Sequence, residues 1–340
     1  STLADVAASA GVSKAAASVV LGRARPGSIR VGAATRAAIS AAALRLGYQS
    51  DHTARSLAIG RTGAIGFLLS SSVSQGWANP YFAGFLPGAE AACRATGHSL
   101  CIATAQLADA GSFIRSPLLA QRRIDGLIVA GELEPQAYAS LESNQLPFVV
   151  LNAPPDLPLP VIDPLPQLTY LRHLAAAGHR RITITRDRPR LALGRRVDAE
   201  VERLREAGVT IDWCVPPPDL HPNWEPGFGL GRWLFQRWQS QCASQRSTVI
   251  VSNAVLYELH RELRLAGLDC PRDLQLLGDG EHGFVDASPR FTTVRVDIHA
   301  IATAAVRLLI TAIEAGTMVD PATCAAVRIA VDINQRETTA

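Results

Sequence analysis

The sequence predicts an all-α, three-helix head of the helix-turn-helix type, followed by an α/β core of two doubly wound parallel-sheet subdomains. Three observations support this prediction. Short helical patterns separated by glycine fill residues 1–49. From residue 63 onward, continuous apolar runs alternate with helical stretches, a pattern typical of parallel strands buried between two layers of helices. The alternation occurs in two series, which the proline-rich segment 153–166 separates.

The head begins with two short helices joined by a turn. Thr2 is suited to cap the first helix, and Gly11 permits the left-handed backbone that ends it. Ser13 is suited to cap a second helix, from Lys14 to about Leu21. Helices this short are not stable alone, so they need a third helix to pack on. That helix is expected over residues 35–46, with Ile39, Ala43 and Leu46 facing inward.

The head is basic, whereas the rest of the chain is slightly acidic. Residues 1–62 hold eight basic side chains and two acidic ones, a net charge of +6, and the whole chain carries +3. The remaining residues therefore total −3. A basic module on a slightly acidic body is expected of a protein that binds nucleic acid through its head. The alternative is an ordinary three-helix bundle with scattered arginines.

The core is predicted as two series of strands and helices, followed by a return of the chain. The first series has strands at 65–69, 100–104, 126–130 and 147–151, with helices at 81–96, up to about 123, and at 135–144. The second series has strands at 161–163, 181–185, 212–215, 248–251 and 274–278, with helices at 166–177, 195–207, 229–240 and 254–266. A strand at 291–296, a helix at 298–315 and a strand near 326–331 complete the chain.

Composition narrows the class of protein further. The 340 residues are 48% hydrophobic, enough for a small head and a two-lobed core. No stretch is expected to reach the length of a membrane span, and the N-terminus lacks a signal-peptide pattern, so a cytoplasmic protein without membrane contact is expected. Neither the six dispersed cysteines nor the eight histidines have the spacing of a metal site, and no disulfide, metal or cofactor is expected.

Catalysis is not expected either. The sequence has no glycine-rich phosphate loop and no nucleophile constellation, and Asp163, Asp187 and Asp279 have no sequence-local partner for acid–base work. No catalytic residue is therefore assigned. A small-solute binding protein of the periplasmic-binding type, without gene control, is the alternative function; the head argues against it.

Several motifs together resemble the LacI/GalR family of bacterial transcription regulators. In the head and the segment after it these are Leu3-Ala-Asp-Val-Ala7, Ala10-Gly-Val-Ser13, Thr35-Arg36, Leu46-Gly-Tyr48 and Ala54-Arg-Ser-Leu-Ala58. In the core they are Asn79-Pro-Tyr-Phe82, Arg123-Ile-Asp-Gly-Leu-Ile128, Ala177-Gly-His-Arg-Arg-Ile182, Thr292-Thr-Val-Arg295 and Arg336-Glu-Thr-Thr339. The resemblance spans essentially the whole chain and implies a core like that of periplasmic binding proteins.

The resemblance implies a DNA-binding surface on the head. In the family the second helix lies in the major groove, where Lys14 can donate to a guanine edge and Ala15 can contact a thymine methyl. Val19 lies one turn further on. Phosphate contacts are expected from Ser13, Ser18, Thr35, Arg36 and Tyr48. Ala16 and Ala17 are interpreted as a small, tight helix core.

A hinge is expected between the head and the core. The resemblance implies that Ala54, Arg55 and Leu57 belong to a short helix that folds when two copies meet in the minor groove. Leu57 would then wedge between the central base pairs and kink the duplex. The alternative is that Leu57 is an ordinary apolar residue of a linker.

The resemblance also implies an effector site between the lobes, where the strands of both sheets end. The expected effector-binding residues are Ser71, Tyr81, Phe82, Glu132, Arg196, Trp224, Asn253 and Glu281. Ser72 is an alternative to Ser71. The alternatives are that Trp224, which taken alone is more often a packing residue, packs in the core, and that Arg196 pairs with Asp198 or Glu200. Gly280 stands where the family usually has an aspartate, which weakens the expectation of a standard monosaccharide.

The expected domain organisation follows from these elements. Residues 1–49 form the DNA-binding head, 50–61 the hinge helix and linker, and 62–340 the effector-binding and dimerisation core. The two lobes are expected at about 62–160 plus 293–320, and at about 161–292 plus 321–340. The predicted function is a homodimeric transcriptional regulator, more specifically a repressor. It would bind double-stranded DNA at a palindromic operator, under control of a sugar or another small metabolite.

Overall fold

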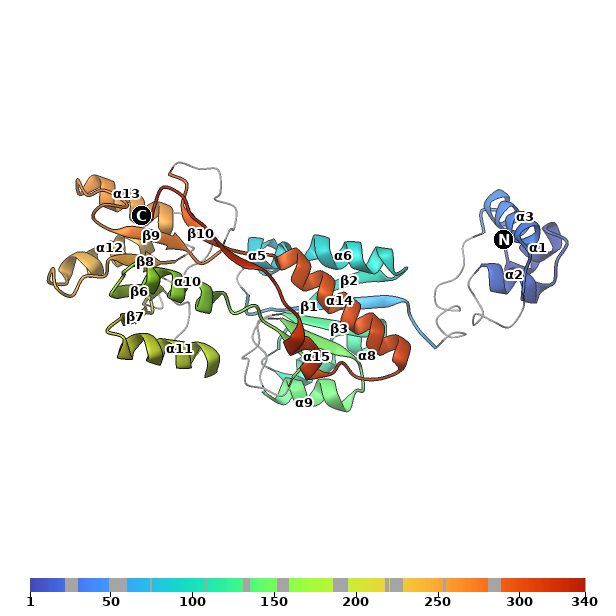
Figure 1. Ribbon diagram of the computed structural model, residues 1–340. Coiled ribbons are helices and arrows are strands. Elements are labelled where there is room, and N and C mark those ends of the chain that lie inside the picture. Colours follow the sequence, from blue (N-terminus) through green and yellow to red (C-terminus); the bar gives the residue numbers. More distant parts are fainter. Residues whose placement is uncertain are drawn as a thin grey trace.

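The structure, a computed structural model, describes residues 1–21, 30–48, 60–73, 75–107, 109–130, 135–151, 159–185, 195–217, 220, 229–252, 255–280 and 289–339. These residues form a three-helix head and a core of two lobes, each built on one sheet (Figure 1). The predicted fold class is confirmed.

The head contains three helices held by side-chain caps and a small core. They are α1 (Leu3–Ser9), α2 (Lys14–Val20) and α3 (Ala33–Arg45). The Thr2 hydroxyl accepts from the backbone N–H of Asp5, and the Asp5 carboxylate accepts from the backbone of Thr2, which forms a capping box. The Ser13 hydroxyl accepts from the N–H of Ala16. Both predicted caps are confirmed.

The third helix differs from its prediction at both ends. It begins at Ala33, two residues earlier than expected, after Gly32, which has no side chain to cap it. Ile39 and Ala43 are buried as predicted, against Val6 and Ala17 among others. Leu46 follows the last helical residue and is 36% exposed, so its predicted inward orientation is wrong.

The first lobe is a five-stranded parallel sheet with helices on both faces. Its strands, in spatial order, are β2 (Ser99–Ala105), β1 (Ala64–Ser70), β3 (Gly126–Ala130), β4 (Phe148–Leu151) and β5 (Val161–Ile162). Its connecting helices are η1 (Gly76–Ala78), α5 (Pro80–Ala83), α6 (Leu86–Ala95), α7 (Ala110–Ile114), α8 (Pro117–Ala120) and α9 (Pro135–Ser143). Alternate residues of β1 pack on opposite faces, Phe67 with the α6 side and Leu68 with the α7–α9 side.

The second lobe repeats this arrangement. Its spatial order is β11 (Val331–Asn334), β10 (Thr292–Val296), β9 (Gln275–Gly278), β8 (Val249–Val251), β6 (Arg181–Thr185) and β7 (Thr210–Cys214), with only the β10–β11 pairing antiparallel. Its helices are α10 (Pro166–Ala176), α11 (Arg195–Glu206), α12 (Leu230–Ser240) and α13 (Leu256–Leu265). The order β7-β6-β8-β9-β10 therefore matches β2-β1-β3-β4-β5 of the first lobe.

The chain passes between the lobes three times. It runs from β5 to α10, from β10 to α14 (Ile298–Ala315), and from α15 (Pro321–Ala326) to β11. Because β5 belongs to the first sheet and β10 to the second, the expected lobe bounds near 161 and 293 are wrong. Cys324 of α15 is buried in the first lobe, so residues 321–326 also belong there rather than to the second lobe.

Three predicted elements differ from the structure for local reasons. The expected helix 81–96 is broken into α5 and α6, because Pro87 has no N–H to donate and fits only in the first turn of a helix. The helix expected up to 123 is two short helices, α7 and α8, and Pro117 begins the second. The strand expected at 326–331 lies at Val331–Asn334 instead, since α15 precedes it.

Helix α14 is the central helix of the first lobe. It is the one described helix long and apolar enough to cross a membrane by length and composition alone, so the expectation that no segment reaches that length is wrong. Its apolar side chains are used within the lobe, however. Ala302, Ala305, Val306 and Leu309 are fully buried against the sheet and α6. In Figure 1, α14 (orange-red) runs along the lobe beside α6.

The six cysteines are free thiols. In the part of the chain that the structure describes, no three His, Cys, Asp or Glu side chains gather in a way that could hold a metal ion. Burial raises the pKa of the Cys93 thiol to about 11, as suits a cysteine that packs as a small apolar residue.

One ion-pair cluster links two helices of lobe 2. The Glu200 side chain of α11 is 6% exposed and bonds to Arg203 at 2.6 Å and to Arg172 of α10 at 3.1 Å. These hydrogen bonds lower the pKa of Glu200 to about 2. A lowered pKa stabilises the fold above the ordinary value of 4.5, and this contribution is lost as the pH falls from there through about 2.

Replacing this carboxylate is expected to destabilise the second lobe. Glu200→Gln should cost about 1–3 kcal/mol of unfolding free energy at pH 7, measured by urea denaturation, because a buried hydrogen-bonded charge is lost. The loss should shrink between pH 4.5 and 2. The control Glu202→Gln, on the exposed side of the same helix, should change stability by less than about 0.5 kcal/mol. Equal effects of the two substitutions would contradict this role.

Candidate nucleic-acid interface and effector cleft

The first two helices have the geometry of a helix-turn-helix unit. The chain bends by 104° between α1 and α2, within the range of about 90–120° for this motif. The turn spans residues 10–13 and contains Gly11 at φ +64°. A turn of this length with a left-handed glycine sets the second helix across the first, so that α2 has one face on the head core and one in solvent.

The outer face of α2 carries the predicted base-reading residues. Lys14 and Ala15, in the first turn, are both exposed, and Val19 is half-buried. Ser13 is exposed and Ser18 half-buried. A lysine at this position can donate to a guanine edge, whereas alanine offers only a methyl group. Of the predicted base-reading residues of α2, Lys14 is therefore the one whose side chain can donate a hydrogen bond to a base.

The inner face of α2 is formed by Ala17 and Val20. Ala17 is fully buried against α1 and α3, Val20 packs on the same core, and Ala16 is half-buried. The small size of Ala17 lets three short helices pack closely, which agrees with its interpretation as part of a tight helix core. Readout by Ala16 or Ala17 is not supported by these positions.

Of the residues expected to contact phosphates, some are accessible, whereas the Tyr48 hydroxyl is buried. Thr35 and Arg36 lie at the third and fourth positions of α3, and Arg36 is exposed near the N–H groups that begin this helix. Such N–H groups attract anions. The Tyr48 hydroxyl is buried and has no hydrogen-bond partner among the described residues. Its predicted phosphate contact is not supported by this position. The predicted hinge residues Ala54, Arg55 and Leu57 lie outside the described residues.

The residues expected to bind an effector lie where the parallel strands end. Ser71 directly follows β1 and is exposed, and its backbone N–H donates to Ala105 at the end of β2. Ser70 and Ser72 share a hydrogen bond of 2.8 Å. The carboxyl ends of β1 and β3 are the point where strand order reverses, which is where open α/β sheets bind ligands.

Aromatic rings form one wall of this end of the lobe. Tyr81 and Phe82 are half-buried in and near α5, and their ring centroids lie 5.1 Å apart, edge to face. Tyr81 also packs on the buried Phe85 at 5.1 Å. Asn79 caps α5 by accepting from the Tyr81 N–H. The cap and the ring contacts hold Tyr81 and Phe82 in place as an apolar surface with one hydroxyl.

The charge of Arg196 acts on an acidic group of the other lobe. Arg196 is exposed in the first turn of α11 in lobe 2, and its positive charge favours the ionised form of Asp163, which directly follows β5 of lobe 1. Burial raises the pKa of Asp163, while the Leu165 N–H and the charge of Arg196 oppose that rise. The expected alternative, pairing of Arg196 with Glu200, is not seen, because Glu200 binds Arg172 and Arg203.

Asp163 is a further candidate for the effector site that the sequence does not single out, because no residue near it in the chain suggests a partner. The signal was present, however, because Asp163 follows a short apolar strand at its carboxyl end, as Ser71 does. Four other predicted effector residues, Glu132, Trp224, Asn253 and Glu281, lie outside the described residues.

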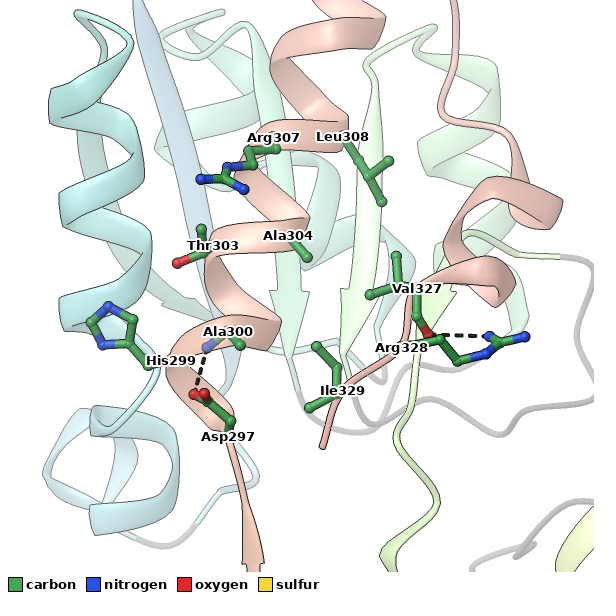
Figure 2. A pocket seen from close by; sticks show the side chains of 10 residues that line it. All are labelled: Asp297, His299, Ala300, Thr303, Ala304, Arg307, Leu308, Val327, Arg328 and Ile329. Atoms are coloured by element: carbon green, nitrogen blue, oxygen red, sulfur yellow. Dashed lines mark hydrogen bonds between the residues drawn. The ribbon is translucent and has the colours of Figure 1, made fainter. Parts of the chain in front are cut away.

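A separate groove lies on the first lobe. It encloses about 500 Å³ between α14 and the segment 327–329 that precedes β11 (Figure 2). Ala304, Leu308, Val327 and Ile329 form its apolar part, and Arg307 stands at its edge. None of the predicted effector residues lines it. The groove is therefore distinct from the predicted effector site.

Comparison with protein families covers nearly the whole core. Residues 62–215 match the family model described as periplasmic binding proteins and sugar binding domain of LacI family. Residues 171–339 match that of the periplasmic binding protein-like domain.

Curated relatives extend the match into the head. The HTH-type transcriptional repressor PurR of Yersinia enterocolitica is 31% identical over 307 residues, which cover 86% of this chain and 84% of that protein. The repressor of the same name from Aliivibrio salmonicida is 27% identical over 333 residues, 91% of each chain.

Solved structures share the fold along the full length. A lac repressor dimer bound to operator and the anti-inducer ONPF aligns with a TM-score of 0.72 at 20% identity, over 100% of this chain and 99% of that one. A complex of the transcriptional regulator CelR with cellobiose aligns with a TM-score of 0.62 at 22% identity, over 99% of each chain. At this identity, these structures establish the fold.

The exposed lysine of α2 gives a direct test of base readout. Lys14→Ala should cost about 1–3 kcal/mol of binding free energy for the specific DNA site and relax the preference for guanine at one position of each half-site. Fluorescence anisotropy with single-base variants of the site would measure both effects. The control Arg94→Ala, on an exposed face of lobe 1, should change neither. An unaltered base preference in Lys14→Ala would refute direct readout by this residue.

Proposed function

This chain belongs to the LacI family of transcriptional regulators, and we propose that it represses transcription from a palindromic operator, as a homodimer controlled by a small effector. The observation that carries this proposal is the capped helix-turn-helix, bent by 104°, with Lys14 exposed at the start of α2. Two such heads on a twofold axis would read half-sites about 34–36 Å apart.

The side chains of the head determine which residues contact bases and which contact phosphates. Lys14, Ala15 and Val19 face the bases, and the exposed Ser13 and Arg36, with Ser18 and Thr35, meet phosphates. Because one lysine is nearly alone as a direct reader, specificity also depends on the hinge. There Leu57 would enter the minor groove and favour deformable central base steps.

The effector is proposed to be a small polar molecule with a ring, such as a sugar or another metabolite. Tyr81 and Phe82 provide an apolar surface on which a ring can pack. Asp163 and Arg196 provide an acceptor and a donor from opposite lobes. A ligand that bonds to both would favour one relation of the lobes over another, and control requires this difference in affinity. Glu132, Trp224, Asn253 and Glu281 are proposed to complete the site.

The protein is proposed to act in the cytoplasm, where bacterial DNA lies, and to have no catalytic role. Its relatives are transcriptional repressors. The domain organisation that fits this role is a head over 1–49, a hinge over 50–61 and a core over 62–340.

A footprint of the purified protein on its own genomic neighbourhood would test the proposed function. The expected result is one or more protected palindromes, with affinity that falls steeply as salt rises, because lysine and arginine contacts release counterions from DNA. If the folded, dimeric protein protects no palindrome at low salt, the proposed function is wrong.

The effector site is tested through Arg196. A thermal-shift screen of sugars, nucleobases and amino acids should identify compounds that raise the melting temperature of the wild-type protein. Arg196→Ala should lower the affinity for such a compound about 10-fold or more, since a charge-assisted hydrogen bond is lost. Arg205→Ala, at the other end of α11, should bind it as the wild type does. Unchanged binding to Arg196→Ala would place the ligand elsewhere.

A further inference from the structure

The first residues of the core are hydrogen-bonded to lobe 1 through the Asp125 carboxylate, and the Gly63 carbonyl also accepts from the Ser99 N–H of β2 at 2.9 Å. Asp125 precedes β3, and its Oδ1 accepts from the Thr62 N–H at 2.7 Å and the Thr62 hydroxyl at 3.0 Å. Its Oδ2 accepts from the Gly63 N–H at 2.7 Å. Its own N–H donates to Ala64 at 2.8 Å. Hydrogen bonds to an ionised carboxylate are about twice as strong as neutral ones.

Arg61, the residue before Thr62, is hydrogen-bonded to α14. The Arg61 guanidinium donates to the carbonyl oxygen of Ile313 at 2.6 Å, in the last turn of the helix. The Ile313 carbonyl also accepts from the Gly316 N–H at 3.3 Å, and the helix dipole favours a cation at this end of the helix. Two consecutive residues, Arg61 and Thr62, are therefore held at two different elements of lobe 1.

Neither tie is needed to hold β1 in the sheet. β1 pairs with β2 over seven residues, from Ala64 to Ser70, and with β3 over five. All seven residues of β1 are buried. The Asp125 and Arg61 contacts act instead on residues 61–63, which lie between this strand and the segment that leads to the head.

The other end of α14 meets the crossover between the lobes. α14 begins at Ile298, directly after β10 of the second sheet, and its 18 residues span about 27 Å. It is packed tightly on α6, because a Cβ at Gly88 would lie 2.4 Å from the His299 carbonyl. A Cβ at Gly84, which ends α5, would lie 2.3 Å from the Ile298 side chain. Figure 1 shows α14 running from the crossover to the side of lobe 1 where β1 begins.

We propose that Asp125 and Arg61 are positioning residues that fix the approach of the head linker to lobe 1. This inference rests on the proposed function, since it concerns how two heads reach one operator. Through Arg61 the linker follows α14, which starts at the lobe crossover, and through Asp125 it follows β3. When lobe 1 moves, the start of the linker therefore moves with it. Without these ties, two heads would lose the fixed separation that a palindrome requires.

Removing the negative charge of Asp125 tests this proposal in the full-length protein. Asp125→Asn removes a negative charge, so simple electrostatics would strengthen DNA binding. Loss of the clamp should instead weaken binding to the palindromic fragment protected in the footprint by about 5-fold or more. Binding to a random-sequence duplex of equal length should stay the same or rise slightly. Asp109→Asn, the same charge change at the cap of α7 in the same lobe, should leave binding to the palindrome within about 2-fold.

Arg61→Ala separates positioning from direct phosphate contact. It should also weaken binding to the palindrome, but the slope of log affinity against log salt should stay that of the wild type. Arg36→Ala should lower that slope by about 1 for each head. Wild-type affinity for the palindrome in Asp125→Asn and Arg61→Ala, or a reduced salt slope in Arg61→Ala, would overturn the proposal. If the wild type itself showed no preference for the palindrome over the random duplex, the proposed function would fall, and this inference with it.

Discussion

The arrangement of the molecule depends on one topological constraint: in each lobe the last parallel strand, β5 or β10, leads from its carboxyl end into the other lobe. β5 leads directly into α10 of lobe 2, and β10 leads directly into α14 of lobe 1. The carboxyl ends of both sheets are therefore brought to the same junction. Ser71, Asp163 and Arg196 all follow from this, since each lies just after a strand or at the start of a helix at that junction.

Close packing of α6 and α14 connects this junction to the start of the core. α14 packs on Gly88 of α6 and on Gly84, which ends α5, and no side chain could be added at either glycine without displacing Ile298 or the backbone of His299. Helices packed this closely move together rather than slide, because protein interiors are nearly incompressible. α6 follows the aromatic wall of α5, and α14 reaches Arg61. The cleft and the start of the core thus lie at two ends of one rigid helix pair.

Much of this architecture was predictable because it depends on local rules. The caps at Thr2 and Ser13, and the strands 126–130 and 181–185, follow from side-chain chemistry and apolar runs. The apolar periodicity of residues 81–96 favours one continuous helix, and it does not show that Pro87 cannot continue a helix. The last strand was misplaced because α15 intervenes, and its burial in lobe 1 depends on contacts with residues far away in the chain. The Asp163–Arg196 interaction was missed for the same reason: nothing local links residues 33 positions apart across two lobes.

The central claim is that two copies of this chain read one palindromic site through heads held at a fixed separation. Sedimentation of the protein with the palindromic fragment, and with a fragment in which five base pairs are inserted at its centre, tests it most directly. The account predicts two chains on the palindrome, and loss of that complex on the lengthened fragment, because half a turn rotates one half-site away from its head. One chain per palindrome, or equal binding of both fragments, would contradict it.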